Sequence, residues 1–294
     1  MNVGKKIREL RVAKLMTQVD LAGTKITRNM LSCIENGSAQ PSLSTILYIA
    51  ERLNVPVGFL LAEEGDEVIY QKITVLPNIK KAYASEDWRG CRSLCLSACR
   101  APDDEIALLL AKCDAEIAVE EFRAGRLHSS CRYFDEAMLY ATKTIYPTSA
   151  LFAKAGVYFR MMQRVSPTLY SDVYEDAACG EYAWESPFVY YVRALEALDD
   201  GSPEKAKELL TRLPQDSFYA EHIHIRLMMG EGRFSEAHDA LSQLLERGTL
   251  PDEVALYSVL SELEICCKET DDFKGAYKYS NERLQQLEHL LREI

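Results

Sequence analysis

The sequence predicts an all-α protein that begins with a compact five-helix domain and continues as an α-solenoid of paired helices. Apolar residues recur at helical spacing along the chain, with almost no alternation typical of strands. From about Val75 onward, several predicted helices begin with a turn, an apolar residue and a small residue three positions later. These observations divide the chain into a domain at 1–62, a linker at 63–74 and a repeat region at 75–294.

The first two helices are predicted from apolar spacing and from a capping signal. A helix from about Val3 to Lys14 has Val3, Ile7 and Leu10 on one face. Thr17 can cap a second, short helix, because its hydroxyl can accept a hydrogen bond from the amide of Asp20. The carboxylate of Asp20 also suits the positive end of that helix.

A third helix is expected after a tight turn at Gly23, with Thr27 as its cap. On a helical wheel its half-buried side carries Met30, Leu31, Ile34 and Glu35. Its opposite side, solvated or facing a ligand, carries Arg28, Asn29, Ser32, Cys33 and Asn36.

The stretches MTQVDLA and ITRNMLSCIENGSAQPSLSTILYIAERLNV resemble the XRE family of lambda-repressor-like helix-turn-helix domains over roughly residues 3–62. The resemblance implies a DNA-binding domain whose third helix enters the major groove. Arginine can read guanine and asparagine adenine, and a cysteine can pack against a thymine methyl. The resemblance also implies phosphate contacts by Gln18 and Thr27, and a structural ion pair of Arg11 with Glu35. The predicted DNA-binding residues are Thr17, Gln18, Thr27, Arg28, Asn29, Ser32, Cys33 and Asn36.

Charge is distributed unevenly along the chain, whose net charge is −11. Residues 1–62 carry eight basic and four acidic side chains, a net charge of +4, and the remainder carries −15. A basic domain on an acidic body is expected when only one end meets phosphates. The predicted affinity for DNA depends together on Lys5, Lys6, Arg8, Lys14, Lys25 and Arg28.

The repeated helix starts resemble the second helices of tetratricopeptide repeats, where a small residue permits close packing of paired helices. The instances begin at Asp87-Trp88, Gly125-Arg126, Gly201-Ser202, Gly232-Arg233 and Asp272-Phe273. The small residues that follow are Cys91, Ser130, Ala206, Ala237 and Ala276. A further copy around Tyr170–Glu185 is poorly defined, and the segment Tyr277–Ile294 can cap the array or pair with a second chain.

Other sequence features favour a cytoplasmic protein without cofactor, metal or catalytic function. No continuous apolar stretch is long enough to span a membrane, and no secretory signal is visible. Nine cysteines occur without a CxxC pair, and Cys91, Cys95 and Cys99 are interpreted as small packing residues. Of Cys266 and Cys267, on different sides of one helix, only one is expected to be buried. His222 and His224 are expected to point to different faces.

An XRE-like domain followed by tetratricopeptide-like repeats resembles the Gram-positive regulators that respond to small peptides. The resemblance implies a transcriptional regulator that binds a double-stranded DNA operator, forms a homodimer through its repeats, and takes a peptide or protein ligand in the repeat groove. Those regulators often hold the peptide backbone with asparagines, whereas this chain has only Asn78 and Asn281 beyond residue 67. The alternative is a protein–protein interaction adaptor with tetratricopeptide-like repeats and a weakly DNA-binding head.

Overall fold

The computed structural model describes residues 3–62, 67–98, 102–169 and 186–292. All regular elements among these residues are helices, so the predicted all-α class is confirmed. The chain divides into two compact units, Met1–Pro102 and Asp103–Ile294, which are described separately below. None of the described helices is long and apolar enough to cross a membrane.

The N-terminal unit begins with the five predicted helices. They are α1 (Val3–Ala13), α2 (Gln18–Ala22), α3 (Arg28–Glu35), α4 (Leu43–Leu53) and α5 (Val57–Leu61). Their core contains Ile7, Leu21, Leu31, Ile49 and Leu53, each with no exposed surface. Apolar residues from all the longer helices meet there, which is what fixes a domain of this size.

Two further helices, α6 (Glu67–Ala84) and α7 (Trp88–Ala98), complete the N-terminal unit as an adjacent packed pair. Helix α6 begins inside the segment 63–74 that the sequence predicts as a linker. The boundary between the two compact units lies instead after Pro102. The functional division of the chain at 63–74 stays a prediction.

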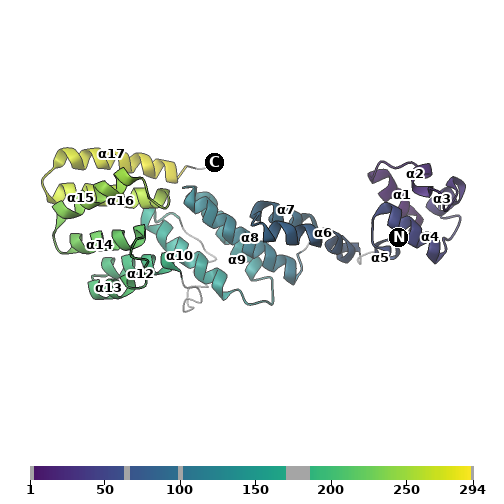
Figure 1. The fold of residues 1–294 in the computed structure, drawn as a ribbon, viewed down its shortest axis with the longest axis horizontal. Helices are drawn as coiled ribbons and strands as arrows, with labels where there is room; N and C mark the ends of the chain where they lie inside the picture. The colour runs from purple at the N-terminus through teal and green to yellow at the C-terminus, as the bar shows by residue number, and fades with distance from the viewer. Residues whose placement is uncertain (1–2, 63–66, 99–101, 170–185, 293–294) are drawn as a thin grey trace. The chain divides into compact units, whose positions relative to one another are not determined.

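The C-terminal unit consists of helices packed mostly as consecutive pairs (Figure 1). They are α8 (Asp104–Arg123), α9 (Leu127–Ala141), α10 (Ser149–Val165), α12 (Pro187–Asp199), α13 (Pro203–Leu210), α14 (Phe218–Gly230), α15 (Phe234–Arg247), α16 (Glu253–Glu269) and α17 (Phe273–Leu290). The pairs are α8 with α9, α12 with α13, α14 with α15, and α16 with α17. The predicted copy around Tyr170–Glu185 lies outside the described residues.

A common turn precedes the second helix of each pair. Its first residue has a left-handed backbone, at Glu86, Gly125, Gly201, Gly232 and Asp271, with φ between 57° and 79°. Five residues later comes the predicted small residue, at Cys91, Ser130, Ala206, Ala237 and Ala276, which is buried in every case. Each left-handed residue reverses the chain, and each small residue lets the paired helices approach closely. The predicted packing role of the small residues is confirmed.

Apart from the exposed Cys33, the cysteines that the structure describes are core residues, with one difference from the prediction. Cys91 and Cys95 are fully buried on α7, while Cys99 lies outside the described residues. The expectation that only one of Cys266 and Cys267 is buried is wrong, because both have at most 1% exposure. Helix α16 has neighbours on both sides, α15 and α17, so both of its faces are covered.

Candidate functional site

Helix α3 is fixed to the N-terminal unit by its inner side and by its cap. The Thr27 hydroxyl accepts a hydrogen bond from the Met30 amide at 3.1 Å, which satisfies one of the unpaired donors at the helix start. Leu31 and Ile34 are buried in the core, whereas Met30 is 40% exposed. The helix therefore begins where the sequence predicts and cannot rotate without exposing apolar side chains.

The opposite side of α3 faces solvent. Arg28, Asn29, Cys33 and Asn36 are exposed and Ser32 is half-buried. Arg28 presents a guanidinium fork and Asn29 presents an amide with both donor and acceptor, the groups that read guanine and adenine edges. The outward side of α3 predicted from the helical wheel is thus the exposed side in the structure.

A buried polar cluster holds α1, α2 and α3 together. Arg11 donates to Glu35 through Nε at 2.6 Å to Oε1 and through Nη2 at 3.0 Å to Oε2. Gln18 Nε2 donates to the same Glu35 Oε2 at 2.9 Å. A bidentate pair of this kind is directional as well as strong. Arg11 and Glu35 form the predicted ion pair, and the side chain of Gln18 is tied to that pair.

The ionisation of Glu35 follows from this cluster. Burial by itself would raise the pKa of the carboxyl, but hydrogen bonds from Arg11 and Gln18 and the charges of Arg11 and Arg8 outweigh it. The result is a pKa below the ordinary value for glutamate. The carboxylate is therefore charged at neutral pH and remains a structural acceptor.

The start of α2 is a capping box. The Thr17 hydroxyl accepts from the Asp20 amide at 3.1 Å, and the Thr17 amide donates to Asp20 Oδ2 at 2.8 Å. Hydrogen bonds from the Thr17 side chain and backbone lower the pKa of Asp20. Thr17 is exposed at the N-terminus of α2, a position where a helix can also approach a phosphate.

The turn between α2 and α3 depends on Gly23. Its φ of +56° and ψ of −134° lie in a region that favours glycine. A Cβ at this position would lie 2.3 Å from the Tyr48 hydroxyl oxygen. That hydroxyl donates to the Ala22 carbonyl oxygen at 3.0 Å. The tight turn predicted from the sequence is therefore built around a residue that must lack a side chain.

A close approach of α1 to α3 depends on a second glycine. A Cβ on Gly4 would lie 1.9 Å from the Ile34 carbonyl oxygen. Because that atom belongs to the backbone of α3, no side-chain rotation can relieve the overlap. Gly4 thus allows α1 to pack closely against the backbone of α3.

The basic residues of the domain divide into exposed and buried ones. Five of the six predicted contributors to affinity are exposed, namely Lys5, Arg8, Lys14, Lys25 and Arg28. Lys6 is only 3% exposed, and its Nζ donates to the Ala62 carbonyl oxygen at 2.6 Å. The expectation that Lys6 contributes to phosphate affinity is wrong, because its ammonium caps the C-terminal end of α5.

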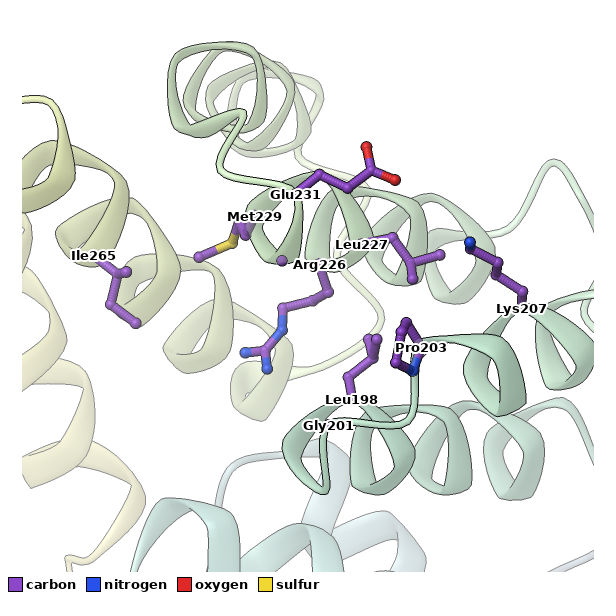
Figure 2. A pocket seen from close by; sticks show the side chains of 10 residues that line it. Leu198, Gly201, Pro203, Lys207, Arg226, Leu227, Met229, Glu231 and Ile265 are labelled. Atoms are coloured by element: carbon purple, nitrogen blue, oxygen red, sulfur yellow. The ribbon is translucent and has the colours of Figure 1, made fainter.

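A separate cavity of about 410 Å³ lies in the C-terminal unit, between α12, α13, α14 and α16 (Figure 2). Its apolar side chains are Leu198, Pro203, Leu227, Met229 and Ile265, and its charged ones are Lys207, Arg226 and Glu231. Arg226 is paired with Asp199 at 2.9 Å and with Glu262 at 3.2 Å, and Lys207 with Glu204 at 2.8 Å. Its cations are therefore neutralised, and the walls offer mainly apolar contact.

Beside this cavity, His222 links three helices in the core. Its Nε2 lies 2.6 Å from Glu262 Oε2, and its Nδ1 lies 2.7 Å from the Tyr191 hydroxyl. A carboxylate only accepts, so Nε2 carries a proton and donates to Glu262. Burial would raise the pKa of Glu262, but His222 and Arg226 hold it below the ordinary value. His224 is exposed, as predicted.

The sequence gives no signal for this cluster, because Tyr191, His222 and Glu262 are 31 and 40 residues apart. Two tyrosines of this part of the chain, Tyr158 and Tyr191, are buried in the core. Among the described residues, no three histidine, cysteine or acidic side chains are grouped so that they could hold a metal ion.

Residues 7–60 match the sequence model of a protein family described as helix-turn-helix. A comparison with curated protein sequences gives no match.

Solved structures similar to this chain include the following three. PlcR of Bacillus thuringiensis, in complex with the peptide PapR7 and DNA, is 14% identical over 99% of both chains, with a TM-score of 0.25. ComR from S. thermophilus, in complex with DNA and its signalling peptide ComS, is 16% identical over 97% of this chain and 99% of that one, with a TM-score of 0.23. The Streptococcus dysgalactiae SHP pheromone receptor Rgg2 is 15% identical over 83% and 99%, with a TM-score of 0.24.

Proposed function

We propose that the chain is a sequence-specific DNA-binding transcriptional regulator that places α3 in the major groove. The observation that carries the proposal is the construction of α3, whose inner side is locked by the core and by the Arg11–Glu35 pair while Arg28 and Asn29 remain in solvent. The helix-turn-helix match over 7–60 supports it. Thr17, Gln18 and Thr27 would meet phosphates, and Ser32, Cys33 and Asn36 would extend the reading side.

Charge supports the same orientation. Six exposed cations lie in the N-terminal domain, the five named above and Arg52, and the rest of the chain is strongly acidic. Phosphates would attract the first region and repel the second, so the domain at 1–62 is the end that meets DNA. We propose that the chain acts on DNA in the cytoplasm and has no catalytic role.

The test is selection of bound genomic fragments, followed by measurement of affinity for the selected operator at several salt concentrations. We expect log affinity to fall linearly with log salt, because phosphate contacts release counterions. Arg28→Ala and Asn29→Ala should each weaken operator binding by roughly five- to hundredfold, from about 1–3 kcal/mol per base contact. They should weaken non-specific binding much less.

Lys80→Ala on α6 is the matched control, since Lys80 is exposed and lies outside the domain at 1–62. It should leave the affinity for operator unchanged. Equal operator affinity of the parent, Arg28→Ala and Asn29→Ala proteins would show that the reading side is assigned wrongly. Absence of any salt-dependent DNA binding would favour the adaptor alternative.

We also infer that the helix pairs of residues 68–294 form a homodimer and bind a peptide or protein ligand. A single small domain buries little surface on DNA, and two domains on a near-palindromic operator are a common solution. The cavity of about 410 Å³ beside Arg226 and Met229 is large enough for an apolar side chain. The net charge of −15 outside residues 1–62 favours a ligand that also carries basic groups.

The ligand hypothesis is tested by screening short apolar peptides with basic residues for thermal stabilisation of the full chain. Operator affinity is then measured with and without each stabilising peptide. A sensor requires reciprocity, so a peptide that weakens operator binding must itself bind less tightly to the DNA-bound protein. Peptides that stabilise the protein without any change in operator affinity would contradict a sensory role.

A further inference from the structure

The last helix, α17, has two sides of opposite character. Its inner side packs on the C-terminal unit through Ala276 and Leu290, which are buried, and through the partly buried Leu287. Its outer side carries Phe273, Tyr277 and Leu284, which are 71%, 72% and 47% exposed. Figure 1 shows α17 as the last layer of this unit, next to α16.

An apolar outer side is unusual for the end of a helical array. Terminal helices of stacked repeats need a polar outer side, because no further repeat covers them. Three large apolar side chains along one helix instead indicate a surface that is covered by another molecule. The sequence predicts that this segment either caps the array or pairs with a second chain. Helix α17 can do both, since one side packs on its own unit and the other side is free for a second chain.

The charges on the outer side indicate which molecule covers it. Lys274, Asn281 and Glu288 are spaced seven residues apart and so lie on one line along the helix, opposite the buried side. Lys274 and Glu288 are exposed, and neither makes an ion pair with any other residue that the structure describes. A cation at one end and a carboxylate at the other, equally far from Asn281, form a self-complementary pattern.

We propose that α17 pairs with α17 of a second copy, antiparallel and centred near Asn281. This inference rests on the proposed homodimer and names its surface. In such a pair Lys274 of each copy meets Glu288 of the partner subunit, because both lie about 10 Å along the axis from the centre. Tyr277 lies about 6 Å from the centre towards one end of the helix, and Leu284 about 4.5 Å towards the other end. In the antiparallel pair, Tyr277 of each copy therefore packs against Leu284 of the partner subunit.

The geometry gives a twofold interface in which two apolar contacts are flanked by two ion pairs. Parallel pairing is excluded by the same pattern, since it would place Lys274 against Lys274 and Glu288 against Glu288 of the partner subunit. The register is specified by residues that have no role in the core of their own chain. Because charge sets orientation here, the proposal can be tested by exchanging charges.

The experiment uses the full chain in sedimentation equilibrium at low salt. Lys274→Glu and Glu288→Lys should each weaken dimerisation by about ten- to thirtyfold, because each converts two attractive pairs into two repulsive ones. The double variant should recover the parent affinity. An equimolar mixture of the two single variants should form heterodimers preferentially, since one ion pair then keeps its original sign and the other is restored with reversed sign.

Lys205→Glu on α13 is the control, as an exposed lysine changed in the same way far along the chain from α17. It should dimerise like the parent. Tyr277→Asp should disrupt the dimer whatever the salt concentration, whereas the effect of the charge variants should shrink at high salt. Circular dichroism of each variant checks that the helices remain folded.

The outcomes separate this inference from the proposed function. Equal dimerisation of the parent, Lys274→Glu and Tyr277→Asp proteins would place the dimer interface elsewhere and overturn this inference alone. Weakening by the single variants without recovery in the double variant would overturn the antiparallel register. A parent that stays monomeric up to about 100 µM, with and without operator, would overturn the homodimer itself.

Discussion

Replacing Gly23 with alanine is expected to destabilise the N-terminal unit through two separable effects. The backbone at φ +56° and ψ −134° would cost a residue with a side chain about 1–3 kcal/mol. The new Cβ would also meet the Tyr48 hydroxyl oxygen at 2.3 Å. Displacing this hydroxyl breaks its 3.0 Å hydrogen bond to Ala22, at a further cost of about 1 kcal/mol. The expected total loss in free energy of unfolding is about 3 kcal/mol.

The two effects can be separated with Tyr48→Phe, which removes only the clashing oxygen. The next atoms that a Cβ on Gly23 would meet belong to Arg52, at 3.0 and 3.1 Å. In the Tyr48→Phe background, Gly23→Ala should therefore cost about 1 kcal/mol less than in the parent. Gly201→Ala is the backbone control, since its φ is +70° and nothing lies within 4 Å of an added Cβ.

The assay is hydrogen exchange of the α1–α5 amides in the full chain, which reports local opening free energies for this unit separately from the rest. Operator affinity is measured on the same samples, because the turn at Gly23 precedes α3. Equal cost of Gly23→Ala in both backgrounds would refute the steric part of the reasoning. Full stability of Gly23→Ala in the parent background would refute both parts.

Three further predictions concern packing and ionisation. Gly4→Ala should lower the stability of the N-terminal unit in urea unfolding by about 2 kcal/mol, because the added Cβ meets the backbone of α3. This loss is expected although alanine has the better helix propensity. Gly230→Ala is the control, which should be neutral or stabilising because nothing lies within 4 Å of its added Cβ. The charged Glu35 should stabilise the parent above about pH 4.3, and this stabilisation should be lost as the pH falls through the lowered pKa of Glu35. Glu35→Gln should abolish it, which thermal melting at a series of pH values will measure. Burial raises the pKa of Asp252 to about 6, so the stability of the parent should decline as the pH rises from about 4 to 6. Asp252→Asn keeps the cap on the Ala255 amide, so it should remove this decline and add about 1–3 kcal/mol of stability at pH 7. An unchanged dependence of stability on pH in this variant would contradict the prediction.

Features of the N-terminal domain that depend on local spacing could be predicted from sequence. Thr17 and Thr27 cap the helices they precede because a hydroxyl at that position reaches an amide three residues on, whatever the rest of the fold. The exposed side of α3 follows from helical periodicity alone. Burial of Lys6 could not be predicted in this way, because its partner is the end of α5, more than fifty residues further along.

The helix pairs show the same limit. The small residues at the second-helix starts were predictable because the turn and the small residue stand within six positions of each other. Burial of both Cys266 and Cys267 was not predictable. Local spacing does not reveal how many helices pack around α16, and this number decides whether one or both of its sides are buried. Only the position of α16 between α15 and α17 decides this. The sequence therefore indicates pairs, and the structure shows how the pairs stack.

The stacking is specified in part by polar side chains that no local pattern reveals. Arg164 on α10 pairs with Asp199 on α12, which pairs with Arg226 on α14, which pairs with Glu262 on α16. Glu262 is also bonded to His222, so this chain of contacts joins four helices and includes buried charge. Loss of one partner would leave another charge buried without compensation, which costs more than the pair contributes. Such a network therefore favours one rotation of each helix relative to the next, and the apolar cavity beside Arg226 keeps its shape for the same reason.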